Sequence, residues 1–561
     1  MAFFKINKRH SLILAMTAII LHAFIMHTFA QSGAKNVLFI AVDDLKPLLS
    51  NYGHKQMHTP NFDRLSKMGA TFTHAYVQQA VCGPSRASVM TGVPPDRTRV
   101  WDLHTDFRHS APDLISMPEY LITQGYETTG IGKIYHKGSA SPGHDGKSWS
   151  IPHIIPYNFD GKYGAPAFGT YQDPCTKAEM NKIKLELIAS GITKGLRKKV
   201  MERLKPSTES VDVPDEAYLD GLYTKEAIKR MKNLAKGDKP FFLAVGFQKP
   251  HLPFVAPKKY WDLYDRDSIK LDAPQSYSKG TPAIAYHPNG ELRSYTDIPD
   301  DLEKGEALPE AKQKELIHGY MAATSYIDAQ IGKLLDTYYA LGLDTNTIIV
   351  LWGDHGYHLG DHTLWCKHSN FEQATHIPLI IAGPGIAKNI YIDRPVELLD
   401  LFPTIFDALN IDIPDQVEGI SLYPLIDGDD STAPPQKDYA ISQYHRRKTV
   451  EGYSIRTGRY RYTEWHTNYY RSYNPYDEKN IVATELYDYE KDPWETENLI
   501  DNPDYKEIKK QLKAKLKKHL MDKYQYYKKN GVNDSLPVLH TYGKRKTKSK
   551  KIFFKKKNKR K

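Results

Sequence analysis

The chain has 561 residues, of which 40% are hydrophobic and 25% charged, a composition that excludes a fibrous or wholly disordered protein. The formal charge of +11 is concentrated at the two ends: residues 544–561 hold twelve Lys or Arg and no acid, and three more basic residues lie among the first nine. Without these fifteen charges the rest of the chain carries −4, so the basic balance does not describe the folded body. Aromatic stacking partners and a recognisable nucleic-acid fold are both missing, which excludes nucleic acid as a substrate.

The first thirty residues have the pattern of a secretory signal peptide. Three basic residues precede an apolar stretch at 12–26, and residues 28–30 supply a small-x-small cleavage site. An uncleaved membrane anchor is the alternative, but the stretch is short for a bilayer span. We therefore expect a periplasmic or secreted protein with no transmembrane segment after cleavage.

Buried strands that end in polar residues dominate the chain up to residue 430. Continuous apolar runs at 36–42, 241–247 and 347–352 predict strands covered on both faces, and a shorter strand is predicted at 126–131. Helical patterns intervene at 60–68, 114–124, 216–234 and 311–341. Alternating strands and helices predict an α/β fold with a doubly wound, mainly parallel sheet, whose ligands bind outside the carboxyl ends of the strands.

A composition shift near residue 430 predicts a second unit. We expect a signal peptide at 1–30, a catalytic domain at 31–430, a smaller C-terminal α+β subdomain at 431–543 and a disordered basic tail at 544–561. The subdomain is rich in Tyr and should contain short strands followed by a helix at 505–528. The tail either binds sulfated polyanions or an anionic surface, or is a solvated tail without a specific role.

A helix should begin beside Cys82. Pro84 suits a first helical turn, residues 84–91 have a helical pattern, and Gly92 is a stop signal. The N-terminus of a helix presents free N–H groups and positive potential, which favour an anion such as sulfate. The alternative for Cys82 is a small buried core residue.

Three acidic side chains follow two of the predicted strands, namely Asp43, Asp44 and Asp354. Converging carboxylates repel one another unless a cation lies among them, and oxygen ligands favour Ca²⁺ or Mg²⁺, with this charge-rich set favouring Ca²⁺. A helix cap or turn is the alternative for the adjacent Asp43 and Asp44. Zinc is a second alternative, because His358, His362 and His368 follow His355 at short spacing; the preferred division has Asp354 and His355 facing the ion.

Lysines and histidines follow the other strand ends. Lys133 and Lys367 are candidate clamps for a bound anion, with a solvated surface amine as the alternative for each. His251, in a rigid Lys-Pro-His-Leu-Pro run, is a candidate proton donor to a leaving alcohol, since an imidazole titrates near neutrality.

The chain resembles type I sulfatases of the alkaline-phosphatase-like superfamily, and within them is similar to iduronate-2-sulfatases. The resemblance extends from residue 36 to residue 500, and Cys82 to Arg86 fits the C-x-P-S-R pattern of these enzymes. Matching stretches include NVLFIAVDDLKP (36–47), FQKPHLPF (247–254) and LWGDHGYHLGDHTLWCKHSNFE (351–372). The departures lie in substrate-facing loops, at 139–215 and 260–310.

This resemblance implies that Cys82 is oxidised to Cα-formylglycine by a sulfatase-maturating enzyme, and that the hydrated aldehyde attacks sulfur. It implies one Ca²⁺ ion held by Asp43, Asp44, Asp354, His355 and the converted Cys82. Arg86 would hold the formylglycine with His136 beside it, and Lys133, His251 and Lys367 would contact the sulfate. His355 stands where many sulfatases carry Asn, which supports the iduronate type.

The expected activity is hydrolysis of sugar O-sulfate esters in a sulfated polysaccharide or its oligosaccharides. Ulvan, with its iduronate and sulfated rhamnose, is a reasonable candidate. Two alternatives stay open: a phosphate or phosphonate monoester hydrolase on the same fold, and a secreted polyanion-binding protein whose Cys82 is never converted. If Cys82 is converted, Cys175 and Cys366 remain, and these two could pair in an oxidising compartment.

Overall fold

The computed structural model describes residues 34–140, 144–159, 162–299, 301–303, 305–428, 437–446, 449–467 and 475–532. The predicted signal peptide and basic tail therefore lie outside the described residues, as does the predicted boundary at residue 430. In the part of the chain that the structure describes, no helix combines the length and the apolar character that a bilayer span requires.

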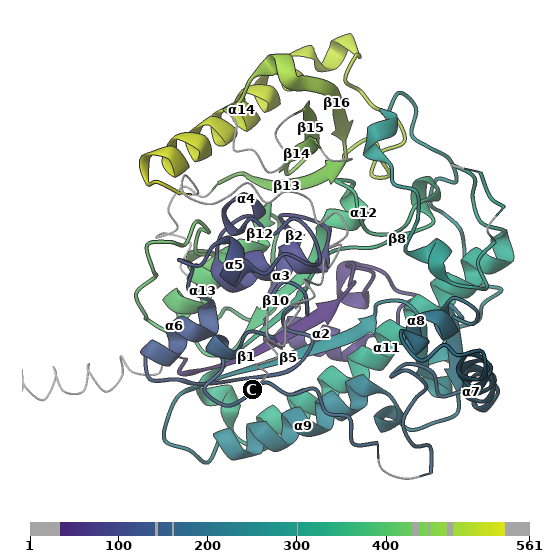
Figure 1. The fold of residues 1–561 in the computed structure, drawn as a ribbon. Coiled ribbons are helices and arrows are strands. Elements are labelled where there is room, and N and C mark those ends of the chain that lie inside the picture. The colour runs from purple at the N-terminus through teal and green to yellow at the C-terminus, as the bar shows by residue number, and fades with distance from the viewer. Residues whose placement is uncertain are drawn as a thin grey trace, which may run out of the picture.

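A mixed sheet of eight strands has the order β11-β2-β10-β7-β1-β5-β3 with β12 beside β2. Figure 1 shows β1, β5 and β10 of this sheet at the centre of the molecule. The strands of the sheet are β1 (Asn36–Asp43), β2 (Gly69–Tyr76), β3 (Glu127–Gly132), β5 (Phe241–Pro250), β7 (Thr347–Gly353), β10 (His376–Ala382), β11 (Ile390–Ile392) and β12 (Val396–Glu397). The four strands β7, β1, β5 and β3 are parallel, as the apolar runs predict.

Only β10 is antiparallel to its neighbours in this sheet, β7 and β2. The chain between β7 and β10 contains only short elements: the strands β8 (His358–Leu359) and β9 (Trp365–Cys366), the 3-10 helix η7 (Asp361–Thr363) and the four-residue helix α12 (Glu372–Thr375). A parallel return needs a long crossover that passes over a face of the sheet, and this segment remains at the strand ends instead. The sheet is therefore mainly parallel with one reversed strand.

Helices cover both faces of the sheet because successive residues of β1 point to opposite sides. Phe39 packs in one apolar cluster with residues of α3 (Cys82–Thr91), α6 (Met117–Thr123) and α13 (Leu401–Ala408). Ile40 packs in the other with residues of α2 (Pro60–Met68), α9 (Leu219–Leu234) and α11 (Glu310–Ala340). This two-sided cover confirms the predicted α/β class.

An insertion of two helices, α7 (Pro174–Ala189) and α8 (Leu196–Met201), packs on the second cluster through Met180, Ile183 and Leu187. After it, β4 (Thr208–Val211) pairs with β6 (Phe254–Pro257), which follows β5. The chain before the C-terminal unit also contains three helices of four residues each, α4 (Pro95–Thr98), α5 (Phe107–Ser110) and α10 (Lys258–Trp261).

The C-terminal unit is a four-stranded antiparallel sheet crossed by one long helix. Its strands are β13 (Tyr439–Arg446), β14 (Val450–Thr457), β15 (Tyr460–Thr467) and β16 (Ile481–Asp488), and its helix is α14 (Lys506–Lys529). Leu512, Leu516 and Leu520 of α14 pack on Ile455 of the sheet. The helix begins one residue later than the predicted range of 505–528 and confirms the α+β pattern.

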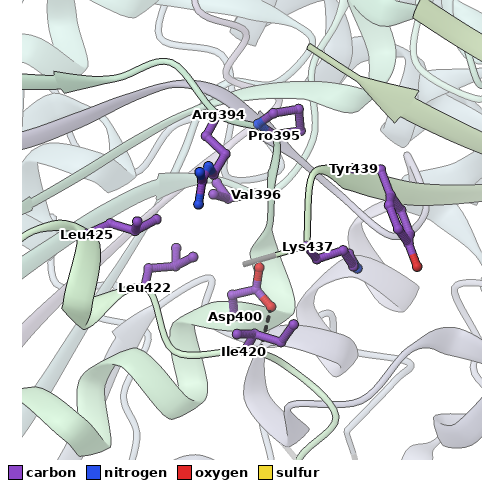
Figure 2. Close-up of a pocket in the computed structure, with 9 residues that line it drawn as sticks. All are labelled: Arg394, Pro395, Val396, Asp400, Ile420, Leu422, Leu425, Lys437 and Tyr439. Atoms are coloured by element: carbon purple, nitrogen blue, oxygen red, sulfur yellow. Dashed lines mark hydrogen bonds between the residues drawn. The ribbon is translucent and has the colours of Figure 1, made fainter. Parts of the chain in front are cut away.

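A small pocket lies where β12 and the turn after it meet the start of β13 (Figure 2). Asp400 lines it, and one oxygen of its carboxylate accepts a hydrogen bond from the backbone N–H of Ile420 at 2.8 Å. None of the residues that line this pocket is a predicted site residue, so we assign the chemistry elsewhere.

Candidate active site

The ends of β1 and β7 bring the predicted carboxylates together. Val42 of β1 is in register with Gly353 of β7, so Asp43, Asp44, Asp354 and His355 leave the sheet at one edge. Asp44 has a left-handed backbone (φ 59°), which an Asp tolerates better than most residues. Its N–H donates to Asp354 Oδ1 at 2.9 Å, which fixes the turn.

The first turn of α3 places Cys82 against this cluster. Its Sγ lies 3.2 Å from His355 Nε2 and 4.0 Å from Asp44 Oδ1. The helix begins at Cys82, two residues earlier than predicted, and ends as predicted at Gly92, which has a left-handed φ of 71° and donates to Ser88 O. All residues of α3 are buried, so Cys82 faces the acidic cluster and not the surface.

Arg86, one turn further along α3, joins the two acidic strand ends. Its Nε donates to Asp354 Oδ2 at 2.8 Å and its Nη2 to Asp43 Oδ1 at 3.1 Å. A third nitrogen donates to the carbonyl of Ile134 at 2.9 Å. The guanidinium is fully buried, and although burial alone lowers its pKa, Asp354 and Asp43 outweigh burial and raise it. Arg86 is therefore a fixed charge that orients both carboxylates.

Lys133, after β3, binds Asp43 and lies 3.7 Å from Cys82 Sγ. Burial alone lowers its pKa, but Asp43 raises it above the usual range. For the Asp43 carboxyl, burial alone raises the pKa, and Lys133 and Arg86 hold it well below its ordinary value. Both groups are therefore charged at neutral pH.

Lys367 is held by two carboxylates. Its Nζ donates to Asp44 Oδ2 at 3.0 Å and to Glu291 Oε1 at 3.0 Å. Although burial alone lowers the pKa of Lys367, Asp44 and Glu291 raise it well above the usual range. The structure thus places both candidate sulfate clamps beside the acidic cluster and not at the protein surface.

His251 lies beside Asp44 and Glu291, and His136 lies within the electrostatic influence of Lys133 and Asp43. His251 Nε2 is 3.3 Å from Glu291 Oε1 and 3.9 Å from Asp44 Oδ2, while its Nδ1 lies 2.6 Å from the carbonyl of Leu252. Burial lowers the pKa of His251. His136 makes no hydrogen bond to the other predicted residues within the described chain; it accepts one from the N–H of Gly138 at 3.3 Å, and burial lowers its pKa to about 3.

Glu291 is the residue that sequence reasoning missed. It comes from the irregular segment before α11, and it contacts Lys367, His251 and His368, the last at 3.1 Å from its Oε2. His368 in turn binds the hydroxyl of Tyr444 from β13 at 2.9 Å. The C-terminal sheet therefore contributes to the rim of the site, and no local pattern in the sequence indicates either contact.

The donor set fits a hard divalent cation. Ligand atoms of Asp44, Cys82 and His355 lie within 4.8 Å of one another, as do those of Asp43, Cys82 and Asp354. Buried carboxylate oxygens with one imidazole and no thiolate pair favour calcium over zinc. Of the clustered histidines, only His355 lies here: His358 binds Ser369 Oγ at 2.7 Å, and His362 lies 3.2 Å from Ser278 Oγ.

The two remaining cysteines are not paired. Cys175 is exposed on α7, whereas Cys366 is buried and accepts a hydrogen bond from the hydroxyl of Tyr357 at 3.3 Å. Cys175 and Cys366 therefore do not form the disulfide that the sequence left open.

A mainly parallel sheet with an acidic edge, opposed by a buried Cys and Arg at a helix N-terminus, defines a hydrolase of the alkaline-phosphatase-like class. The chain belongs to the Sulfatase family, whose profile matches residues 35–411, and its members are sulfuric ester hydrolases. A second profile, the C-terminal region of N-sulphoglucosamine sulphohydrolase, matches residues 360–522.

Three known proteins show the range of its relatives. Human (Homo sapiens) iduronate 2-sulfatase is 32% identical, over 84% of this chain and 92% of its own length. An ulvan-active sulfatase of Formosa agariphila is 26% identical, over 87% of this chain and 81% of its own. The structure of a phosphonate monoester hydrolase from Silicibacter pomeroyi superposes with a TM-score of 0.63 at 22% identity, covering 87% of this chain and 95% of that one, and this likeness concerns the fold alone.

Proposed function

We propose that this enzyme hydrolyses O-sulfate esters of a sulfated polysaccharide or its oligosaccharides through a formylglycine at position 82. The observation that carries the proposal is the position of Cys82 Sγ, at the start of α3 within reach of His355, Asp44 and Lys133. A core cysteine needs none of these charged neighbours. As a thiol it is a poor nucleophile there, because burial, followed by Asp43, raises its pKa well above the usual range.

Conversion by a maturating enzyme would replace the thiol by a hydrated aldehyde, one hydroxyl of which attacks sulfur while the other permits later release of sulfate. Asp43, Asp44, Asp354 and His355 would hold Ca²⁺, which supplies charge stabilisation for the sulfate oxygens. Lys133 and Lys367 offer their ammonium groups to the remaining oxygens. Because the Nδ1–H of His251 is engaged by the carbonyl of Leu252, His251 presents Nε2 to the leaving alcohol. It can donate a proton from Nε2 only as the imidazolium, a form that burial disfavours and that Asp44 and Glu291 favour.

A count of buried charges favours a sulfate ester over a phosphate monoester. The site holds four carboxylates and three permanent cations, which leave a net charge of −1. The carboxylates are those of Asp43, Asp44, Asp354 and Glu291, and the cations are those of Arg86, Lys133 and Lys367. A divalent cation makes the site +1, which a singly charged sulfate ester neutralises. The dianion of a phosphate monoester would leave a buried negative charge uncompensated.

The relatives suggest the sugar. One is named for iduronate 2-sulfate and another for ulvan. We therefore propose 2-sulfated iduronate or sulfated rhamnose–uronate units as substrates, in a periplasmic or secreted enzyme. Hydrolysis of a phosphonate monoester is the second candidate, because such an ester also carries one negative charge and satisfies the same charge count.

The deciding experiment measures sulfate released from ulvan-derived and glycosaminoglycan-derived oligosaccharides by ion chromatography. We expect release by the wild type and none by Cys82→Ala at an unchanged melting temperature. The mass of the peptide that holds Cys82 should show formylglycine in active protein. Equal activity of Cys82→Ala, or faster hydrolysis of p-nitrophenyl phosphate than of the sulfate, would reject the proposal; an unconverted thiol in protein from its native host would favour the polyanion-binding alternative.

Removal of the cation provides a separate prediction. Chelation with EGTA should abolish sulfate release, and added Ca²⁺ should restore it. Asp354→Asn should raise the Ca²⁺ concentration needed for half-maximal activity by roughly tenfold or more, since one charged ligand is lost. An unchanged Ca²⁺ dependence in Asp354→Asn would remove this residue from the ligand set.

A further inference from the structure

The insertion formed by α7 and α8 carries a local excess of positive charge, as the C-terminal helix α14 also does. Residues 177–205 hold nine Lys or Arg and three Glu, whereas the chain without its two basic ends carries −4. The apolar side of α7 is buried through Met180, Ile183 and Leu187, so its charged side faces solvent. Figure 1 shows both helices at the margin of the molecule on the side of β8, away from α14.

All three glutamates of this segment are already paired. Glu179 binds Lys182, Glu202 lies 3.8 Å from Lys198, and Glu186 lies 3.4 Å from Arg203. Four further cations are exposed and form no ion pair with any residue that the structure describes: Lys184, Lys194, Arg197 and Lys199. We call these four residues the α7–α8 basic surface.

Lys205 connects this surface to the active site. Its Nζ donates to Ser294 Oγ at 2.6 Å and lies 3.7 Å from the centre of the Tyr295 ring. Ser294 Oγ in turn donates to the carbonyl of Glu291 at 2.6 Å, and the Glu291 carboxylate holds Lys367. Lys199 is six residues before Lys205, so the two lie at most about 20 Å apart. The segment that follows the basic surface is therefore anchored, through Lys205, beside the segment that holds Glu291.

The chain that leaves the insertion also supports the proton donor. Directly after Lys205, Ser207 accepts a hydrogen bond from the N–H of Phe254 at 2.8 Å, and β4 then pairs with β6. Phe254 is three residues beyond His251. The insertion is thus fixed relative to the site by backbone hydrogen bonds on one side and by the Lys205–Ser294 contact on the other.

We propose that the α7–α8 basic surface docks the flanking sulfated units of a polysaccharide chain while one sulfate ester occupies the active site. This inference rests on the proposed function, because a polymer with repeated sulfates must leave the site over the neighbouring protein surface. Sulfate monoanions on that polymer match exposed Lys and Arg in sign, and the attraction acts over about a Debye length.

The test compares two variants with the same change in net charge. Lys184→Glu/Lys194→Glu/Lys199→Glu alters the proposed surface, and Lys225→Glu/Lys232→Glu/Lys236→Glu alters exposed lysines on and after α9. Binding of the full chain to immobilised dextran sulfate is measured against unsulfated dextran. At about 0.1 M NaCl we expect the first variant to bind roughly tenfold more weakly and the α9 variant to change less than about twofold, with the difference vanishing near 1 M salt.

Kinetics separate this inference from the proposed activity. Both variants should hydrolyse a small sulfate ester as the wild type does, while KM for sulfated polysaccharide should rise only in the α7–α8 variant. If no sulfate ester is hydrolysed by the wild type, the proposed function fails, yet the binding comparison still decides the docking surface. Melting temperatures of the variants, and the milder Lys184→Gln/Lys194→Gln/Lys199→Gln, control for folding.

Three outcomes would overturn the docking surface. One is equal binding of dextran sulfate by both charge-reversal variants. Another is that truncation after Gly543 abolishes binding while the α7–α8 substitutions have no effect in either the full or the truncated chain. That result would assign binding to the basic tail. The last is that the α7–α8 substitutions weaken binding to vesicles of anionic phospholipid but not to dextran sulfate. That result would assign the surface to a membrane.

Discussion

Glu291 shows how one residue can organise groups from distant parts of the chain. It holds Lys367 and His368 with its two oxygens and lies beside His251. Glu291→Ala should therefore lower kcat for sulfate release by about tenfold to a hundredfold, because Lys367 and His251 lose a common anchor. Glu291→Gln should lose less, since an amide oxygen can still accept from Lys367. Comparison of the two variants on sugar sulfates checks this, and equal losses in both would show that charge rather than position matters.

Asp220 provides a pH-dependent prediction at the same scale. Its carboxylate accepts the N–H of Gln248 at 2.7 Å and that of Lys249 at 3.2 Å, just before His251. Burial raises its pKa from 3.8 to about 6, against the opposing effect of these hydrogen bonds. Because the folded state holds the proton more tightly, the stability that Asp220 contributes is complete below its unfolded pKa and is lost as the pH rises through about 6.

The Asp220→Asn variant cannot titrate at this position. The free energy of unfolding of wild type should therefore fall relative to the variant by about 2 kcal/mol between pH 4 and pH 7. The hydrogen bond that the amide loses adds an offset that does not depend on pH. Urea unfolding across this range measures the difference, and parallel curves for the two proteins would contradict the shifted pKa.

At the scale of elements, α11 supplies the cap that α2 lacks in its own sequence. Asp328 of α11 accepts the N–H groups of Asn61 and Phe62 at 2.8 and 2.9 Å, and also the Asn61 side chain at 2.8 Å. The N-terminus of α2 has no side-chain cap from its own N-cap residue, Thr59. One helix therefore fixes the start of another across the core.

Asp328→Ala should lower the free energy of unfolding by about 2–3 kcal/mol, because three donors, among them the buried N–H of Phe62, lose their acceptor. Asp336→Ala on the same helix is the matched control, since its ion pair with Arg64 is exposed and should contribute less than about 0.5 kcal/mol. The midpoint of urea unfolding checks both. A similar midpoint for the two variants would mean that water replaces the cap without cost.

The sequence predicted the elements and the strand-end residues well, because both depend on local patterns. The apolar run that forms β1 ends where Asp43 and Asp44 begin, so one short stretch, residues 36–44, predicts both the strand and the acidic residues of the site. Glu291 and Tyr444 could not be found this way. Their partners lie 76 residues away in the chain, and the segment around Glu291 has no periodic pattern. The reversed β10 was missed because strand direction depends on the path of the connection.

For the whole molecule, the junction between the central and C-terminal sheets is built from buried charges. The carboxylate of Glu372 in α12 accepts hydrogen bonds from Arg456 Nε of β14 at 3.0 Å and from the hydroxyl of Tyr76 at 2.7 Å. The backbone N–H of Glu372 donates to the carboxylate of Glu495 at 3.0 Å. Burial alone raises the pKa of Glu372, but Arg456 lowers it to about 2. The loop with Lys367 and His368 leads directly into this network.

Arg456→Ala should destabilise the molecule by about 3–5 kcal/mol, because it leaves the buried Glu372 charge unpaired. It should also lower sulfate release, since the Lys367 loop loses its support. Arg459→Ala is the control: its partner Asp488 is buried, but Arg459 itself is 39% exposed, so the loss should be smaller. Calorimetric unfolding and kcat measure the two effects. An Arg456→Ala protein as stable as Arg459→Ala would show that the junction does not depend on this pair.

The seclusion of Cys82 sets an order of events during biosynthesis. With 3% of its surface exposed and the whole of α3 enclosed, the side chain is out of reach of any other enzyme once the domain has assembled. The proposed oxidation of this position would therefore have to act on the nascent or unfolded polypeptide. A batch made in a host without the oxidising machinery should stay inactive on later exposure to it in native form, and should gain activity only when unfolded, treated and refolded.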